Sequence, residues 1–386
     1  MKRFLLHSLL FSLPLLCVFV PSAVVLWYSG EFDSLSTVEA LQMRTDSTTA
    51  YTAAYSNFVY KLKQELTLRK HPSVLALGSS HVGQFRSLFF KDPSSFYNAS
   101  NATAAMSDFS YFIDSLGDAQ PQVLIMSTDI SAFDPSTSRD HLVRPNRFGD
   151  SISPTDVVTE SLITNQAWWK VYADYAAGKF SLSDVFALHT SPTTIGLYAR
   201  ANDSGYLNDG STYDGKILTS TREQQKELQA IHTLAASIST TTGYEYGSSI
   251  SPETLRSLAD FLTLCKTKHI YVIGFIPPIP HEVYQKMSTF PTATYRTPLE
   301  TLAPTLKALY TSYGFDFFDF SDIAAYGSSD QEMVDPYHGS EKTYLRLFIQ
   351  MAKQDTVLAP LVDVQDLQQR LDQSTSPYVV FGVTAK

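Results

Sequence analysis

Short apolar runs recur along the chain between residues 73 and 320, and each predicts a buried strand. The expected strands lie at 73–77, 96–98, 122–127, 269–275 and 315–320. Amphipathic segments separate them and predict helices at 103–116, 252–266, 302–313 and 341–353. This alternation predicts an α/β fold, a three-layer sandwich in which helices cover both faces of a mostly parallel five-stranded sheet.

The start of the chain has a different pattern. An apolar stretch from Phe4 to Tyr28 follows Lys2 and Arg3 and contains no charged side chain. As a helix it would reach about 37 Å, enough to cross a bilayer. The basic pair favours a cytoplasmic N-terminus and a C-terminal domain outside. The sequence therefore predicts a single-pass signal-anchor at 4–28. The alternative is a signal peptide cleaved after Ala23, which fits less well because Pro21 would stand where a small residue is expected.

The pattern divides the rest of the chain into four parts. A membrane-proximal helical region, with one helix over 36–69, precedes the α/β domain. An insertion rich in Ser, Thr, Asp and Gly interrupts that domain, with helical pieces near 156–177 and 221–239, and we expect it over the carboxyl edge of the sheet. The predicted bounds are 29–72 for the membrane-proximal region, 73–354 for the domain, about 135–250 for the insertion and 355–386 for a weakly patterned tail.

Composition excludes several classes of function. The formal net charge is −9, with 29 Lys and Arg against 38 Asp and Glu, which argues against nucleic acid as the main partner. With two cysteines, Cys17 and Cys265, neither a disulfide framework nor a cysteine zinc site is expected. The sequence contains no metal-ligand cluster, phosphate-binding loop or dinucleotide-binding glycine pattern, so no cofactor is expected.

Two motifs follow predicted strands. Ser79 and Ser80 follow the strand at 73–77, where a strand-to-helix turn can expose a nucleophile. Asp335 and His338 follow the last strand, at a spacing that lets a carboxylate orient an imidazole as general base. Each motif alone also fits a structural role, as small turn residues or as a cap. Both lie at carboxyl ends of parallel strands, however, so we expect them at one edge of the sheet.

This order of motifs resembles the SGNH (GDSL-type) hydrolase superfamily. The segments LALGSSHVGQF, SFYNAS, QVLIMSTDISAFD, VIGFIPPIP and MVDPYHGS are similar to a membrane-anchored branch that includes D-alanine transfer proteins and alginate O-acetylation proteins of bacterial envelopes. The resemblance implies Ser80 as nucleophile, His338 as base and Asp335 as orienting acid. It also implies the backbone N–H of Ser80 as one donor to the oxyanion.

The chain departs from the superfamily pattern at three places. Ser79 replaces the aspartate before the nucleophile, and the second block lacks its usual glycine. Ser127-Thr128-Asp129 stands where the third block has G-x-N-D, so the expected asparagine donor is missing. Candidates for oxyanion or substrate binding are Asn98, Asn101, Asp129 and His81.

The resemblance implies a serine esterase or O-acyltransferase that acts on envelope or secreted polysaccharide through an acyl-Ser80 intermediate. It further implies a bacterial inner-membrane location and a possible multi-span acyltransferase partner. The alternative is an inactive relative that binds glycan or scaffolds a polysaccharide assembly; an anchored α/β domain with unrelated binding also stays open. Trp168 and Trp169, in the insertion, fit either a sugar-stacking platform or a half-buried core.

Overall fold

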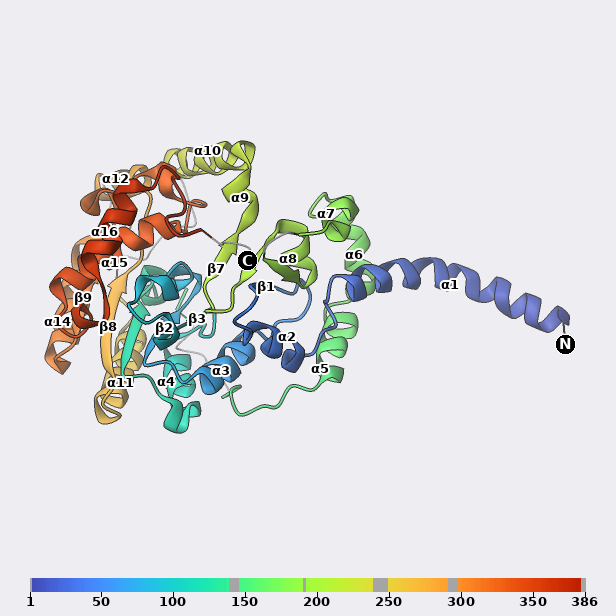
Figure 1. Ribbon diagram of the computed structural model, residues 1–386, viewed down its shortest axis with the longest axis horizontal. Helices are drawn as coiled ribbons and strands as arrows, with labels where there is room; N and C mark the ends of the chain where they lie inside the picture. Colours follow the sequence, from blue (N-terminus) through green and yellow to red (C-terminus); the bar gives the residue numbers. More distant parts are fainter. Residues whose placement is uncertain are drawn as a thin grey trace.

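A long N-terminal helix projects from the body of the protein (Figure 1). The computed structural model describes residues 2–135, 137–138, 146–189, 192–238, 249–290 and 298–382, with side chains from residue 11 onward. Helix α1 covers Lys2–Tyr28 and continues through Pro14 and Pro21. Its segment Phe11–Tyr28 has a mean hydropathy of 1.9 and is long and apolar enough to cross a membrane.

The body is built on a five-stranded sheet in which all strands are parallel, which confirms the predicted α/β class. The strand order is β3-β2-β4-β8-β9. The strands are β2 (Val74–Gly78), β3 (Phe96–Ser100), β4 (Val123–Ser127), β8 (Tyr271–Ile276) and β9 (Asp316–Asp319). Every residue of the first three is buried, as expected for parallel strands whose two faces are both covered.

Helices pack on both faces of this sheet. Neighbouring residues of β8 show this, because successive strand residues point to opposite faces. Gly274 leaves room for the ring of Tyr310, from α14, whereas the ring of Phe275 lies 5.5 Å from that of Phe85 on the other face. Phe85 in turn contacts Tyr344 of α15. The helices are α4 (Met106–Ser115), α11 (Pro252–Thr267), α12 (His281–Ser288), α14 (Ala303–Tyr313) and α15 (Glu341–Gln354).

A second, four-stranded sheet was not predicted. Its order is β5-β1-β6-β7, and its strands are β5 (Thr193–Ile195), β1 (Thr49–Tyr51), β6 (Ser204–Tyr206) and β7 (Thr212–Asp214). The prediction of one helix over 36–69 was therefore wrong: α2 (Leu35–Gln42) and α3 (Val59–Lys70) flank β1. The run of Ser and Thr at 47–49 has low helix propensity and suits a strand.

The insertion lies against the carboxyl edge of the large sheet, as predicted. The N–H of Thr212 donates to the carbonyl of Gly83, just after β2, at 2.7 Å. The N–H of Asn98, in β3, donates to the carbonyl of Asp209 at 2.8 Å. Its helices are α5 (Pro154–Thr159), a π-helical turn (Glu160–Thr164), α6 (Ala167–Ala176), α7 (Leu182–Phe186), α8 (Leu197–Asn202), α9 (Gly215–Thr219) and α10 (Thr221–Ser237). Residues 139–145 and 239–248 of the predicted insertion lie outside the described residues.

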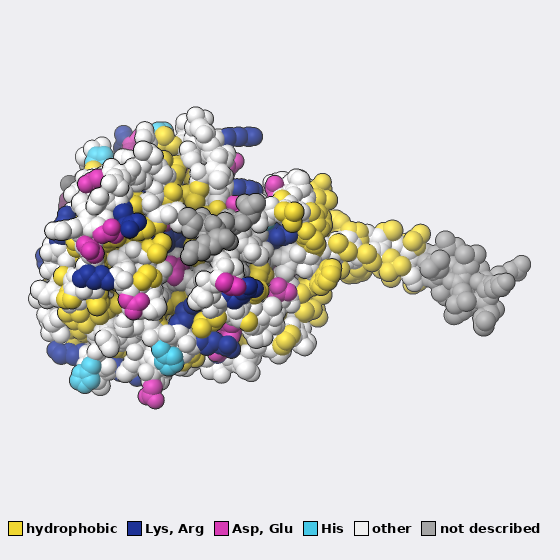
Figure 2. Space-filling view, viewed as in Figure 1, with side chains coloured by type: hydrophobic (Ala, Val, Ile, Leu, Met, Phe, Trp, Pro, Cys, Tyr) yellow, Lys and Arg dark blue, Asp and Glu magenta, His cyan; other side chains and the backbone are white. Residues whose placement is uncertain are grey.

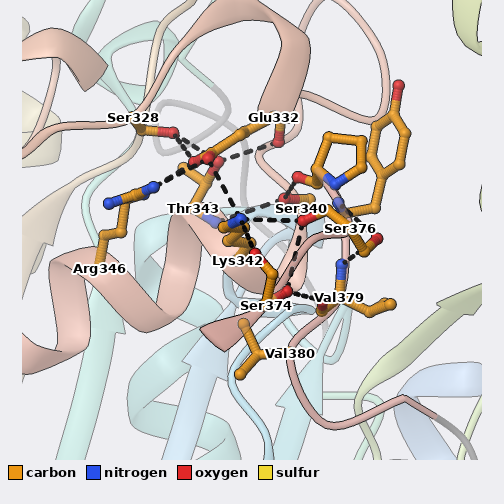
Figure 3. Close-up of polar contacts among 12 residues, drawn as sticks. Ser328, Glu332, Ser340, Lys342, Thr343, Arg346, Ser374, Ser376, Val379 and Val380 are labelled. Carbon is orange, nitrogen blue, oxygen red and sulfur yellow. Dashed lines mark hydrogen bonds and ion pairs between the residues drawn. The ribbon is translucent and has the colours of Figure 1, made fainter. Parts of the chain in front are cut away.

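The tail forms a helix, α16 (Val364–Gln373), and then folds back over the start of α15 (Figure 3). Lys342 Nζ donates to the backbone carbonyls of Ser374 and Ser376 at 3.1 and 2.9 Å. The carboxylate of Glu341 accepts the N–H groups of Val380 and Phe381, both at 2.8 Å. These contacts hold the tail against the helix that directly follows the Asp335–His338 motif.

Candidate active site

Three side chains from distant parts of the chain form a continuous hydrogen-bonded chain. Ser80 Oγ lies 2.7 Å from His338 Nε2, although the two residues are 258 positions apart. His338 Nδ1 lies 2.8 Å from Asp335 Oδ2 and 3.0 Å from Oδ1. With the proton on Nδ1, the imidazole donates to Asp335 and leaves Nε2 to accept from the serine. This is the geometry of a Ser-His-Asp triad.

The turn after β2 presents Ser80 at the sheet edge. Ser79 caps the short helical turn η1 (Ser80–Val82), and its Oγ accepts the N–H of His81. Gly78 precedes it because a Cβ there would lie 2.3 Å from Ser127 Oγ on the neighbouring strand. Ser80 is the first residue of this turn, so its N–H has no acceptor within the turn.

A tight loop before α15 presents the other two residues. Asp335 accepts the backbone N–H groups of Tyr337 and His338 at 2.7 and 2.8 Å. The N–H of Val334 donates to the carbonyl of His338 at 2.9 Å and closes the loop. Burial raises the pKa of Asp335, but its hydrogen bonds to His338 and to these N–H groups outweigh burial and bring the pKa below its ordinary value. Asp335 therefore stays ionised and fixes the imidazole.

Solvent reaches this site. The exposed fractions of the His338 and Asp335 side chains are 29% and 35%. A partly open triad at the carboxyl edge of a parallel sheet lies where ligands bind in such folds.

His81 forms a second histidine–aspartate pair beside the first, and its ring centre lies 5.1 Å from that of His338. Its Nδ1 lies 3.1 Å from Asp129 Oδ1, and its Nε2 lies 3.1 Å from the carbonyl oxygen of Tyr337. Nδ1 also lies 3.1 Å from Ser79 Oγ, which can donate or accept. Both ring nitrogens carry hydrogen when Nδ1 donates to Asp129 and Nε2 donates to Tyr337. Burial lowers the pKa of His81, but Asp129 and the Tyr337 carbonyl raise it more, and the net shift is upward. We interpret His81 as an imidazolium that joins the two loops.

The structure excludes Asn98 as an oxyanion donor. Its side chain is fully buried, and Nδ2 donates to the carbonyls of Val82 and Phe85 at 2.7 and 3.0 Å. Its Oδ1 accepts the N–H of Ser100. The hydrogen bonds of Asn98 to Val82 and Phe85 instead stabilise the turn that carries Ser80.

Asn101 lies nearer the edge, but its side chain is also occupied. Its backbone has a positive φ of 60°, and its N–H donates to the carbonyl of Gly78. Its Nδ2 donates to the hydroxyl of Tyr206, in the insertion, at 2.8 Å. Asp129, the other predicted donor position, is held by His81. Tyr206 therefore takes one of the two Nδ2 hydrogens of Asn101, and the ionised carboxylate of Asp129 has no hydrogen to donate.

The insertion contributes residues that the sequence did not single out. Asp214, at the end of β7, accepts from Gln84 Nε2 at 3.2 Å and interacts electrostatically with His338 and Asp335. Burial raises the pKa of this carboxyl. Tyr198 of α8 is half exposed and also lies within electrostatic range of Asp335. No sequence motif identifies these residues, because only the packing of the insertion against the large sheet brings them near the triad.

Comparison with known proteins places the chain in a family. The model of the family described as "Protein of unknown function (DUF1574)" matches residues 17–354. The chain belongs to this family. The match covers the second half of α1, both sheets and α15, so the triad and the insertion are parts of the family's domain. No curated protein and no solved structure gives a match. Among the described residues, no group of three His, Cys, Asp or Glu side chains could hold a metal ion.

Proposed function

We propose that this DUF1574 protein is a membrane-anchored serine esterase or O-acyltransferase that acts on a polysaccharide of the bacterial envelope. The observation that carries the proposal is the hydrogen-bonded chain from Ser80 through His338 to Asp335. A serine and a D-x-x-H motif can each be structural, but a structural role does not require all three to meet in this order.

The geometry supports acyl transfer in two steps. His338 Nε2 takes the proton of Ser80 as Oγ attacks the ester carbonyl. The ester C–O bond then breaks, the alkoxide leaves with the proton from His338, and the acyl group stays on Ser80. In the second step, water or a sugar hydroxyl gives its proton to His338 and attacks the acyl carbonyl. The bond between Ser80 Oγ and the acyl group then breaks, and His338 returns the proton to Ser80. The Ser80 N–H would stabilise the oxyanion in both steps.

The sheet order and the triad support kinship with the SGNH superfamily. The nucleophile follows β2 and the D-x-x-H loop follows β9, in the order of that superfamily. The main difference is at Asp129, where the third block normally has an oxyanion-donating asparagine. Loss of one such donor typically costs about 10²–10³ in rate. We therefore expect low intrinsic activity toward simple esters.

The location is part of the proposal. The basic pair before α1 and the length of its apolar segment support a signal-anchor with the α/β domain outside. Contacts of α1 with the body favour retention over cleavage after Ala23: Ser22 and Leu26 are buried, and the ring of Phe19 lies 5.2 Å from that of Trp168.

A second candidate function is glycan binding or scaffolding without catalysis. The occupied amide of Asn98 and the ionised carboxylate at Asp129 favour it, because neither can donate to an oxyanion. For the catalytic function, a partner that supplies acyl groups, such as a multi-span acyltransferase, would fit an anchored relay protein.

Labelling with a fluorophosphonate separates the two functions, because this probe reacts only with an activated serine. Wild type and Ser79→Ala should be labelled, and Ser80→Ala should not. Ser79→Ala is the matched control, since it removes a neighbouring hydroxyl from the same turn. Labelling of Ser80→Ala equal to wild type would remove Ser80 from the site. A folded wild type that stays unlabelled would favour the non-catalytic function.

A further inference from the structure

Apolar side chains gather where α1 leaves the body, over α6 and α7 (Figure 2). We define this collar as six exposed residues of the insertion: Ile163, Trp169, Tyr175, Leu182, Phe186 and Leu188. Leu188 is 91% exposed and Ile163 is 71% exposed. Exposed apolar side chains of this size, grouped on one surface, usually mark an interaction site.

Helix α6 packs along the outer part of the apolar segment of α1. The ring of Trp168 lies 5.2 Å from that of Phe19, and the hydroxyl of Tyr172 donates to the carbonyl of Val18. Farther along, Tyr28 contacts Phe186 of α7, with 4.6 Å between the ring centres. The collar is thus continuous with the helix that we propose to cross the membrane.

The length of α1 sets the depth of this contact. A hydrocarbon core of about 30 Å takes roughly 20 residues of helix. Counted from Arg3, that core would end near Ser22 or Ala23. Val18 and Phe19 would then lie inside the hydrocarbon, about one turn below its outer boundary. Since α6 touches both residues, α6 cannot lie wholly in water while α1 spans the bilayer.

We propose that the collar is a membrane-seating surface, whose partner is the outer leaflet of the bilayer that α1 crosses; this rests on the proposed anchoring. Aromatic rings are enriched at the level of lipid headgroups, which suits Trp169 and Tyr175. The exposed side chain of Lys170 can extend to lipid phosphates. Seating through a second element would fix the orientation of the α/β domain on the membrane.

The chain has three tryptophans, and all of them report on this region: Trp27, Trp168 and Trp169. The test reconstitutes the full chain in vesicles of phosphatidylcholine and phosphatidylglycerol with brominated acyl chains, which quench tryptophan on contact. One variant keeps only Trp169 (Trp27→Phe with Trp168→Phe). A second replaces all three with Phe and adds Phe11→Trp, which lies inside the hydrocarbon by the count above. A control replaces all three with Phe and adds Leu88→Trp, outside the collar.

Seating predicts that Trp169 is quenched about as strongly as the Phe11→Trp reporter, and that the Leu88→Trp reporter is not. Quenching of the Phe11→Trp reporter without quenching of Trp169 would overturn the collar and leave the anchor intact. Absence of quenching at both would overturn the anchor and the collar together.

A second measurement does not depend on the tryptophan substitutions. Leu188→Cys, in a Cys17→Ser background, carries a polarity-sensitive label at a position whose exposure makes a folding defect unexpected. In vesicles, its emission should lie at shorter wavelength than that of the same label at Leu88→Cys, which lies outside the collar. An equal, water-like emission at both positions would contradict seating.

Discussion

At the scale of single residues, the two aspartates that pair with histidines at the site have separate tasks. Asp335 holds His338, and Asp129 holds His81 beside it. Each aspartate therefore pairs with one imidazole, and the two rings lie side by side. Loss of Asp335 and loss of Asp129 should therefore have different effects, because only His338 contacts Ser80.

His338 and Asp335 should be unequal in catalysis. His338→Ala removes the group that takes the proton, whereas Asp335→Asn keeps an imidazole that water can partly orient. In a well-studied triad of another fold, loss of the base costs about 10⁶ in turnover and loss of the aspartate about 10⁴. We expect smaller absolute losses here but the same order, measured with p-nitrophenyl acetate.

Folding must be unchanged for this comparison, and the exposed fractions of both side chains indicate that it will be. Circular dichroism melts of both variants provide the control. Turnover by His338→Ala at the wild-type rate would make the D-x-x-H loop purely structural.

The His81–Asp129 pair should make stability depend on pH. The folded pKa of His81 is raised, so its contribution is complete below the unfolded value near 6.5 and is lost as pH rises through the folded value. The folded pKa of Asp129 is lowered, because its bonds to His81 outweigh burial, so its contribution is lost as pH falls through that value. The pair thus contributes most in mildly acidic solution.

Melting temperatures of wild type and His81→Asn, measured at roughly pH 5.5, 7 and 9, test this pH dependence. The difference between the two proteins should be largest at the lowest pH and should shrink toward the highest. A difference that stays constant across the range would mean that His81 acts through packing and not through charge.

At the scale of elements, a buried ion pair joins the parts that surround the triad. Arg86 Nε donates to Glu341 at 3.1 Å, Nη1 to Ser211 of the insertion at 2.6 Å, and Nη2 to Gln84 at 2.8 Å. The exposed fractions of the Arg86 and Glu341 side chains are 7% and 4%. One guanidinium therefore connects the turn after β2, the insertion and the first residue of α15.

Arg86→Met should strongly destabilise the fold. It leaves the Glu341 carboxylate buried without its partner, and loss of one member of a buried pair typically costs about 3–5 kcal/mol. Urea unfolding measures the change. Arg44→Met, at the exposed pair with Asp46, is the control and should unfold like wild type. Equal stability of Arg86→Met and wild type would show that water stabilises the Glu341 carboxylate in place of Arg86.

The sequence was most informative about long elements with regular patterns. The five apolar strands and the helix capped by Ser340 were predicted to within a few residues, because buried strands are uniformly apolar and caps have a clear signature. The meeting of Ser80 with the Asp335–His338 motif also followed, since carboxyl ends of parallel strands share one edge.

Other features had no local signal. The strands of the second sheet are three residues long, too short to show a period, and β1 gains its partners only from the insertion. The role of Asn98 was mistaken for the same reason. It lies on the strand beside the one that leads to Ser80, but its side chain donates to the backbone carbonyls of Val82 and Phe85. Long-range pairing decides both cases.

At the scale of the whole molecule, the orientation of α1 determines where the triad works. Fusion of alkaline phosphatase to the C-terminus should give an active enzyme, because the basic pair keeps the N-terminus inside and sends the rest across. The same phosphatase fused after a variant that moves Lys2 and Arg3 to the far end of α1 should lose activity. Activity confined to the cytoplasm would reverse the topology, and a mature N-terminus at Val24 would replace the anchor by a signal peptide.

The pairing of β1 with β5 also has a consequence for biogenesis. Thr49 pairs with Thr193, so the small sheet cannot close until the insertion has been synthesised. At about 5–20 residues per second, β1 waits roughly 7–30 s for its partner. The contact between Ser80 and His338 forms later still, since His338 follows Ser80 by 258 residues. A chain interrupted before Thr193 would therefore leave β1 without the strands that pair with it in the folded protein.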